Sequence, residues 1–249
     1  MNYTIEELQA NYEKFLSYID RYITGERKDL LKNLYVEHTE RIMLMPAASV
    51  DHHHNTFPGG YVDHVMRVID CALKLKDLWA ETGAFINYTD EELVFAAINH
   101  DLGKIGSEEA EQYLHNDSEW HRKNQGKIYK HNPENPFLTV PDRGLFLLQQ
   151  RGIKVSLNEY LGIKLHDGLY EEANKSYYIS YAKESKLRTH LPILLHHADH
   201  MASRIEFEKW DKLQNNDSIT KEKRKPNVPT SMSETQKDDL MNVFNTLFK

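Results

Sequence analysis

The sequence predicts an all-α protein, a helical bundle with irregular loops and at most a small hairpin. Two observations favour it. Apolar residues recur at helical spacing in several separate segments, and capping sequences precede several of them, as Thr4 does with Glu7 three residues later. In addition, no alternating strand pattern stands out and nothing repeats internally, so neither a large sheet nor a solenoid is indicated.

The individual helices follow from these signals in chain order. Thr4 opens the first with a capping box. Thr89 opens a helix whose first turn is acidic, which suits its positive end, and Ser156 caps a later one. The expected helices cover residues 4–20, 27–44, 61–79, 89–100, 141–151, 156–166 and 188–211.

The segments between these helices are expected to be loops. Residues 45–60 contain Pro46, Pro58, Gly59 and Gly60, which interrupt regular structure. Residues 107–140 are polar and predict an irregular excursion with a short helix at its start, and residues 166–186 predict a loop with local structure. A hairpin, if present, is expected within 120–140 or 170–182.

We expect three parts in the chain. Helices in residues 1–44 pack on a core domain formed by residues 45–211. Residues 212–249 predict a polar, flexible segment followed by a short amphipathic C-terminal helix, "DDLMNVFNTLFK".

Composition bounds the class of protein. The chain has 249 residues, 40% hydrophobic and 28% charged, which is ordinary for a globular protein. No apolar run of about 18 residues predicts a membrane span, and no secretory signal is visible. The one cysteine, Cys71, fits a reducing compartment, so a cytoplasmic protein is expected. The net charge of −7 argues against a long nucleic-acid footprint.

The unusual feature is the number of histidines, which is 14. His64, the pair His100-Asp101, and Asp199 fall on three different predicted helices, too far apart in the chain for a linear zinc motif. Helical bundles build metal sites from side chains on facing helices. A mixed set of imidazoles and carboxylates suits a divalent transition metal such as Mn, Fe, Co, Ni or Zn.

The order His64, His100-Asp101, Asp199, with Gly103-Lys104 after the pair, resembles the HD-domain superfamily of metal-dependent phosphohydrolases. The resemblance covers roughly residues 45–210. The lead-in "PAASVDHHHNTFPGGYVDHV" is similar to the branch that contains bacterial 3′→5′ exoribonuclease catalytic domains. It implies an HD-domain bundle in which a metal ion, Mn favoured, activates water for attack on a phosphoester.

The resemblance also implies roles for single residues. His64, His100, Asp101 and Asp199 would hold the metal, and Asp101 could bridge to a second ion. Lys104 would steady a phosphate as a point charge. His166, which resembles the histidine of a His-x-Gly segment, or a loop histidine would protonate the leaving group.

The sequence departs from the binuclear members of the superfamily at one position. The helix expected to open with a further histidine ligand opens instead with Pro141-Asp142, which favours one tightly bound metal and leaves a second ion open. His121, His131 and Asp142 are the candidate substitutes. We leave open which of His53 and His54 contacts the phosphate. For His196, a hydrogen bond next to the site or packing in the core is favoured over a direct role in the site.

The expected substrate is a nucleotide or short oligonucleotide, because no oligonucleotide-binding barrel precedes the domain. One alternative is a 3′→5′ exonuclease on single-stranded RNA or DNA. A second is an HD-fold di-iron oxygenase, which requires the complete ligand set, and a third is a non-catalytic nucleotide-binding module. An oligomer is left open, and no membrane partner is expected.

Overall fold

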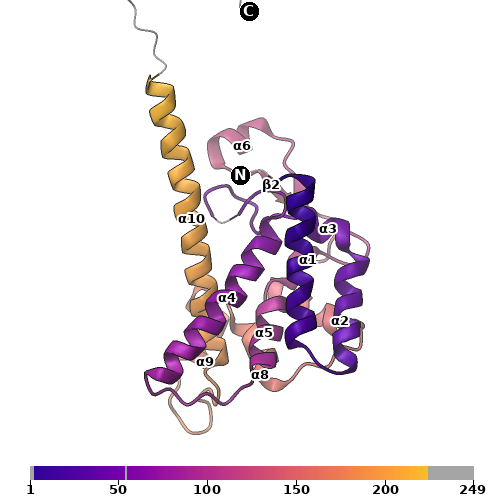
Figure 1. The fold of residues 1–249 in the computed structure, drawn as a ribbon, viewed down its shortest axis with the longest axis vertical. Coiled ribbons are helices and arrows are strands. Elements are labelled where there is room, and N and C mark those ends of the chain that lie inside the picture. Colours follow the sequence, from indigo (N-terminus) through magenta and orange to yellow (C-terminus); the bar gives the residue numbers. More distant parts are fainter. Residues whose placement is uncertain (1–2, 54, 224–249) are drawn as a thin grey trace, which may run out of the picture. The chain divides into compact units, whose positions relative to one another are not determined.

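The structure, a computed structural model, describes residues 3–53 and 55–223, with side chains up to residue 215. Contacts divide the chain into two units, Met1–Asp211 and Lys212–Lys249, and the fold described below is that of the first. The described residues are mostly helical and contain one small two-stranded sheet. The predicted all-α class is therefore confirmed (Figure 1).

Three helices form the N-terminal part: α1 (Ile5–Tyr22), α2 (Glu26–Glu37) and α3 (Thr39–Leu44). The capping box is present, since the Glu7 amide donates to Thr4 Oγ1 and the Thr4 amide to a Glu7 carboxylate oxygen. The predicted helix 27–44 is two helices, because His38 lies outside the helical region at φ −109° and ψ 25°. Apolar side chains of α1 and α2 are buried in the same core as the helices that follow.

The core is organised around α5 (Asp90–Asn99), which packs against α4 (Gly60–Glu81) on one side and α8 (Leu157–Leu165) on another. Every residue of α5 from Leu93 to Asn99 is buried, as expected of a helix surrounded by other elements. Its N-terminus carries the predicted Thr89 capping box. A 3₁₀ turn, η1 (Leu102–Ile105), continues from its end and packs on α7 (Val140–Gln150).

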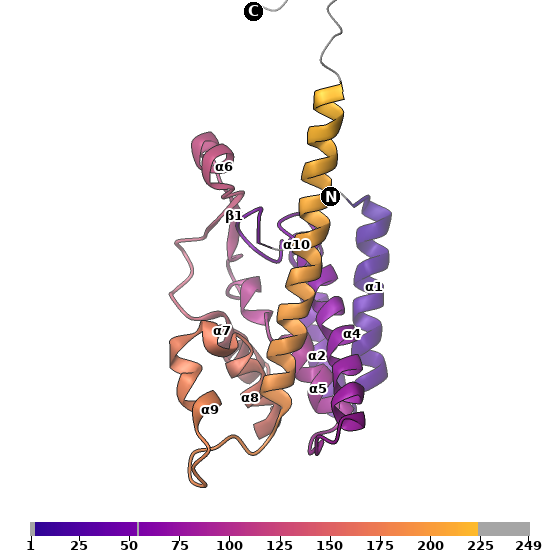
Figure 2. The same ribbon diagram turned by 90° about the vertical axis from the view of Figure 1, so that its left-hand side faces the viewer.

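The excursion after η1 differs from its prediction. A hairpin pairs β1 (Tyr113–His115) with β2 (Tyr129–His131), so it begins earlier than expected. The short helix α6 (Glu119–Gln125) lies between the two strands and not at the start of the excursion, because Ser118 supplies its N-cap. Both views show α6 at the tip of the excursion (Figure 2).

The loop of residues 45–59 is joined to this excursion. The Asp51 amide donates to the Gly126 carbonyl at 2.8 Å, and the Tyr129 amide to the Ser49 carbonyl at 3.1 Å. The two segments therefore position each other.

The chain from His166 onward contains short turns before the last helix. These are η2 (Gly168–Tyr170), η3 (Glu172–Asn174) and α9 (Lys175–Ile179), and α10 (Leu191–Lys223) follows. The last helix extends beyond its predicted end at Asp211, since no proline or glycine interrupts the chain before Lys223. The short C-terminal helix predicted for residues 238–249 lies outside the described residues. Within residues 3–53 and 55–223, no helix combines the length and apolar character needed to cross a membrane.

Candidate metal centre

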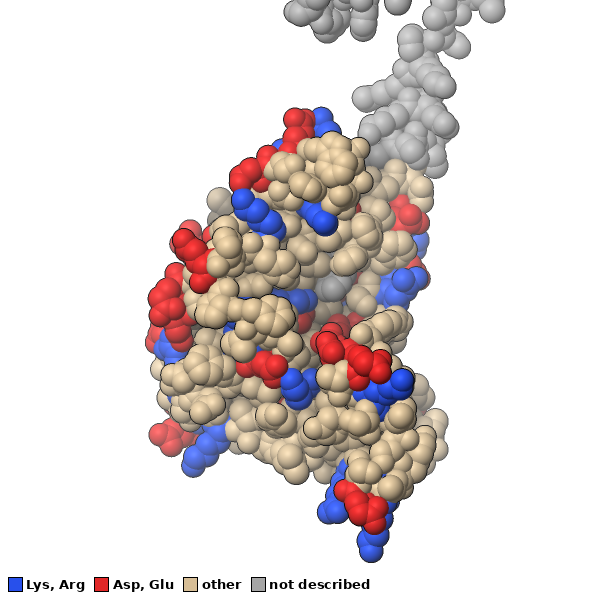
Figure 3. Space-filling model, turned by 180° about the vertical axis from the view of Figure 1, so that it is seen from behind, with Lys and Arg blue, Asp and Glu red and all other residues tan. Residues whose placement is uncertain are grey.

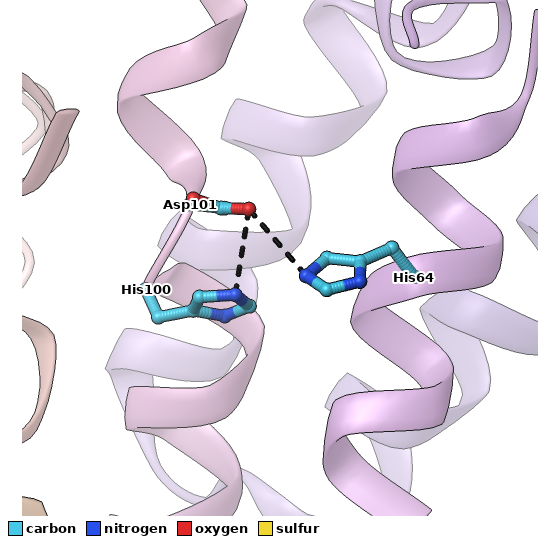
Figure 4. A group of neighbouring side chains, drawn as sticks. All are labelled: His64, His100 and Asp101. Carbon is cyan, nitrogen blue, oxygen red and sulfur yellow. Dashed lines mark ion pairs between the residues drawn. The ribbon is translucent and has the colours of Figure 1, made fainter. Parts of the chain in front are cut away.

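Four predicted metal ligands meet where α4, the end of α5 and α10 approach one another. His64 projects from α4, His100 caps the C-terminus of α5, and Asp101 follows it directly. The His64 Nε2 atom lies 3.1 Å from Asp199 Oδ1 and 3.6 Å from Asp101 Oδ2. Figure 4 shows His64 and His100 facing Asp101, whose Oδ2 lies 3.4 Å from His100 Nε2. His100 Nε2 also lies 4.0 Å from Asp199 Oδ1.

Glu206 fixes the orientation of His64. Its carboxylate lies 3.1 Å from His64 Nδ1 and also accepts a hydrogen bond from Arg67 Nε at 3.0 Å. A carboxylate can only accept, so Nδ1 carries a proton, and Nε2 is the nitrogen that faces the two aspartates and can bind a metal once it has lost its own proton. Metal-binding histidines in proteins commonly have such a carboxylate behind them.

His100 and His166 are held by the same local device. Each caps the C-terminus of its helix, α5 or α8, and donates from Nδ1 to the carbonyl three residues back: Ala97 at 2.7 Å and Ile163 at 2.8 Å. Both rings therefore direct Nε2 toward Asp101. The Nε2 atom of His100 is buried and forms no hydrogen bond within the described part of the chain. A buried nitrogen lone pair in this position costs free energy unless something binds it, and a metal ion fits that requirement.

The two carboxylate oxygens of Asp101 contact different residues. Oδ2 accepts from Lys104 Nζ at 2.6 Å and faces His64 and His100, whereas Oδ1 lies 3.7 Å from His166 Nε2. Burial raises the pKa of Asp101, but its neighbours, the charged Lys104 foremost, lower it more, to well below its usual range. Asp101 is thus ionised at neutral pH and can face two cations at once.

The other charged groups reinforce this state. Burial raises the pKa of Asp199, but its hydrogen bond with His64 and the charge of that ring lower it more. Burial lowers the pKa of Lys104, but Asp101 raises it more, so the ammonium stays charged. Lys104 also donates to the Ala47 carbonyl at 2.7 Å, which fixes its position.

Two overlapping groups of ligand atoms could each hold a metal ion. One is His64, His100 and Asp101, and the other is His100, His166 and Asp199, with all ligand atoms of a group within 4.8 Å of one another. A cavity of ≈ 270 Å³ lies beside them. Its charged and imidazole lining residues are Asp101, Lys104, His166, Asp167, Glu171 and Asp199.

The candidate substitutes for the missing histidine lie elsewhere. His121 is exposed on α6 against Trp120, and His131 accepts a hydrogen bond from Gln112 on the hairpin. Asp142 pairs with Lys164 at 2.6 Å. Among the described residues, none of the three belongs to a group that could hold a metal.

Of the loop histidines, His54 lies outside the described residues. Burial lowers the pKa of His53, and the charges of His52 and Lys104 lower it further. His196 donates from Nδ1 to the His166 carbonyl at 2.8 Å, and its ring packs against Gly168. His196 therefore supports the segment that carries His166.

Sequence reasoning missed two residues near the site. Glu206 pairs with Arg67 and also orients His64. Its spacing of two helical turns after Asp199 was the available signal. Asp167, whose Oδ1 lies 3.7 Å from His166 Nε2, had no signal beyond its place in the chain.

No protein-family model matches the sequence, and neither the search of curated proteins nor the search of solved structures finds a match.

Proposed function

We propose that the protein is a metal-dependent phosphohydrolase of the HD type that cleaves a phosphoester of a nucleotide or short oligonucleotide. One observation carries the proposal. Imidazole nitrogens of His64 and His100 and carboxylate oxygens of Asp101 and Asp199 converge at a buried point beside a cavity that also holds a lysine. This donor set suits a divalent transition metal, and Mn²⁺ is the ion we favour.

Metal binding and stabilisation of the phosphoryl group would fall to different residues of the site. His64, His100, Asp101 and Asp199 would hold the ion, which when bound would polarise a phosphoryl oxygen and make water a stronger acid. Lys104 keeps a fixed positive charge at the cavity wall, where it can stabilise negative charge on a phosphoryl group.

His166 is the residue suited to protonate the leaving oxygen. Burial lowers its pKa, but Asp167 and Asp101 raise it more, which favours a ring that can donate a proton. His54 is a further candidate for contact with the phosphate.

Surface charge supports a small substrate over a long nucleic acid. On the face drawn in Figure 3, Lys and Arg side chains alternate with Asp and Glu. A long nucleic acid is bound mainly by a continuous track of positive charge. Exonuclease activity on single strands is therefore the less favoured version of the proposal.

The di-iron oxygenase keeps one supporting observation, the second group formed by His100, His166 and Asp199. Metal analysis separates the two functions. An oxygenase predicts two irons per chain and a mixed-valent signal in electron paramagnetic resonance, whereas the hydrolase predicts turnover with Mn²⁺ and no need for O₂.

The function is tested by incubating the full chain with Mn²⁺ and a panel of nucleoside mono- and triphosphates, cyclic dinucleotides and short single strands. Products are separated by chromatography. The variant His100→Ala should lose turnover, and His190→Ala, which alters an exposed histidine beside Trp79, should keep it. Equal turnover by His100→Ala, or no turnover on any member of the panel, would contradict the proposal.

A further inference from the structure

A second cavity, of ≈ 420 Å³, has Lys104 in its wall, and we call it the ring pocket. Its volume is within the range of about 300–1,000 Å³ typical of small-molecule sites. Lys104 lines both cavities. The ring pocket and the cavity beside the metal centre are therefore neighbours that share a wall residue.

The walls of the ring pocket suit a flat aromatic group. The hairpin supplies Tyr113 and Tyr129, whose ring centroids lie 6.4 Å apart at 57°, and both rings are partly exposed. The chain leaving α3 supplies Met45 and Pro46, which are buried. Aromatic rings next to apolar side chains bind the π-face of a base, whichever base it is.

The charge of the ring pocket argues against a second phosphate. Its basic residues are Arg41 and Lys104, and its acidic residues are Glu40 and Glu111. These formal charges cancel, so an uncharged ring suits the pocket better than an anion.

The hairpin is fixed in place before any ligand binds. Gln112 donates to His131 Nδ1 at 2.7 Å and accepts from Arg143, which locks the base of the hairpin. The Tyr129 amide donates to the Ser49 carbonyl in the loop of residues 45–59. The aromatic wall therefore needs little ordering on binding, which favours affinity.

We infer that the ring pocket binds the nucleobase of the substrate, with Tyr113 and Tyr129 as the residues that recognise the ring. This inference rests on the proposed function for the phosphate end of the substrate. It selects nucleotides over phosphoesters that lack a nucleobase, such as ribose 5-phosphate.

The test separates the pocket from the chemistry by using adenosine, which has no phosphate. Its binding to the full-length, metal-free chain is measured by calorimetry, with ribose as the comparison. Adenosine should bind, and Tyr113→Ala or Tyr129→Ala should each weaken it by about 5- to 150-fold. Tyr113→Leu, which keeps apolar bulk, should also weaken it, and Trp120→Ala, which alters an exposed aromatic residue outside the pocket, should not.

Hydrolysis of adenosine monophosphate and of ribose 5-phosphate is compared in the same variants. If adenosine binds as inferred but neither these esters nor any member of the substrate panel is cleaved, the proposed function fails and the ring pocket stands. If both esters are cleaved equally well and Tyr113→Leu, folded by circular dichroism, binds adenosine as the unmodified chain does, the ring pocket is refuted alone.

Discussion

Replacing Glu206 by glutamine should weaken metal binding although it alters none of the four proposed ligands. Glu206 is buried and lies 3.1 Å from His64 Nδ1, where its negative charge stabilises the Nδ1–H tautomer and increases the basicity of Nε2. Loss of such a partner typically reduces metal affinity about 10- to 100-fold, or about 1.4–2.7 kcal/mol. The amide keeps the size of the side chain, so packing around it is retained.

The assay is calorimetric titration with Mn²⁺, combined with urea unfolding of the metal-free protein to confirm that the variant folds. Glu208→Gln is the matched control, because Glu208 is exposed on the same helix and the same charge is removed. We expect Glu206→Gln to lower the affinity for Mn²⁺ and Glu208→Gln to leave it unchanged. Equal Mn²⁺ affinities in the two folded variants would refute the role assigned to Glu206.

Two further predictions concern pH and the segment behind His166. In the metal-free protein burial lowers the pKa of His64, but two neighbouring carboxylates raise it more, to about 10. A proton must therefore leave when a metal binds, and Mn²⁺ affinity should rise by up to about tenfold per pH unit below that value, whereas a pH-independent affinity would contradict this. Gly168→Ala should destabilise the fold by about 1–3 kcal/mol in urea unfolding, since φ is +57° and the new Cβ would lie 2.5 Å from the His196 ring. Gly152→Ala, at φ +66° with open space around it, should cost only the backbone strain, about 1–2 kcal/mol, and the reverse ranking would count against this packing.

Helix starts were predictable because their causes are local. The hydroxyl of Thr4 and the carboxylate of Glu7 are three residues apart, and the structure contains both of their bonds to the backbone. The break at His38 had no comparable signal, because no proline or glycine occurs there. Each hairpin strand has only three residues, which is too few for an alternating apolar and polar pattern to be recognised. The position of the strands depends on their pairing with each other, which the sequence does not reveal.

The candidate site was predictable to the extent that its side chains belong to a recognisable order along the chain. The structure brings His64, His100, Asp101 and Asp199 together, although their role as metal ligands stays a prediction. Glu206 was missed because it contacts a residue 142 positions away, and helix periodicity says which face it occupies but not what that face touches.

The most direct measurement is an anomalous-scattering map from crystals grown with Mn²⁺ or Zn²⁺. Our account predicts a strong peak within bonding distance, about 2.0–2.2 Å for Zn²⁺, of Nε2 of His64 and His100 and of the carboxylates of Asp101 and Asp199. A map with no peak among these four side chains, at metal concentrations that saturate the crystal, would contradict the central claim that they share one ion.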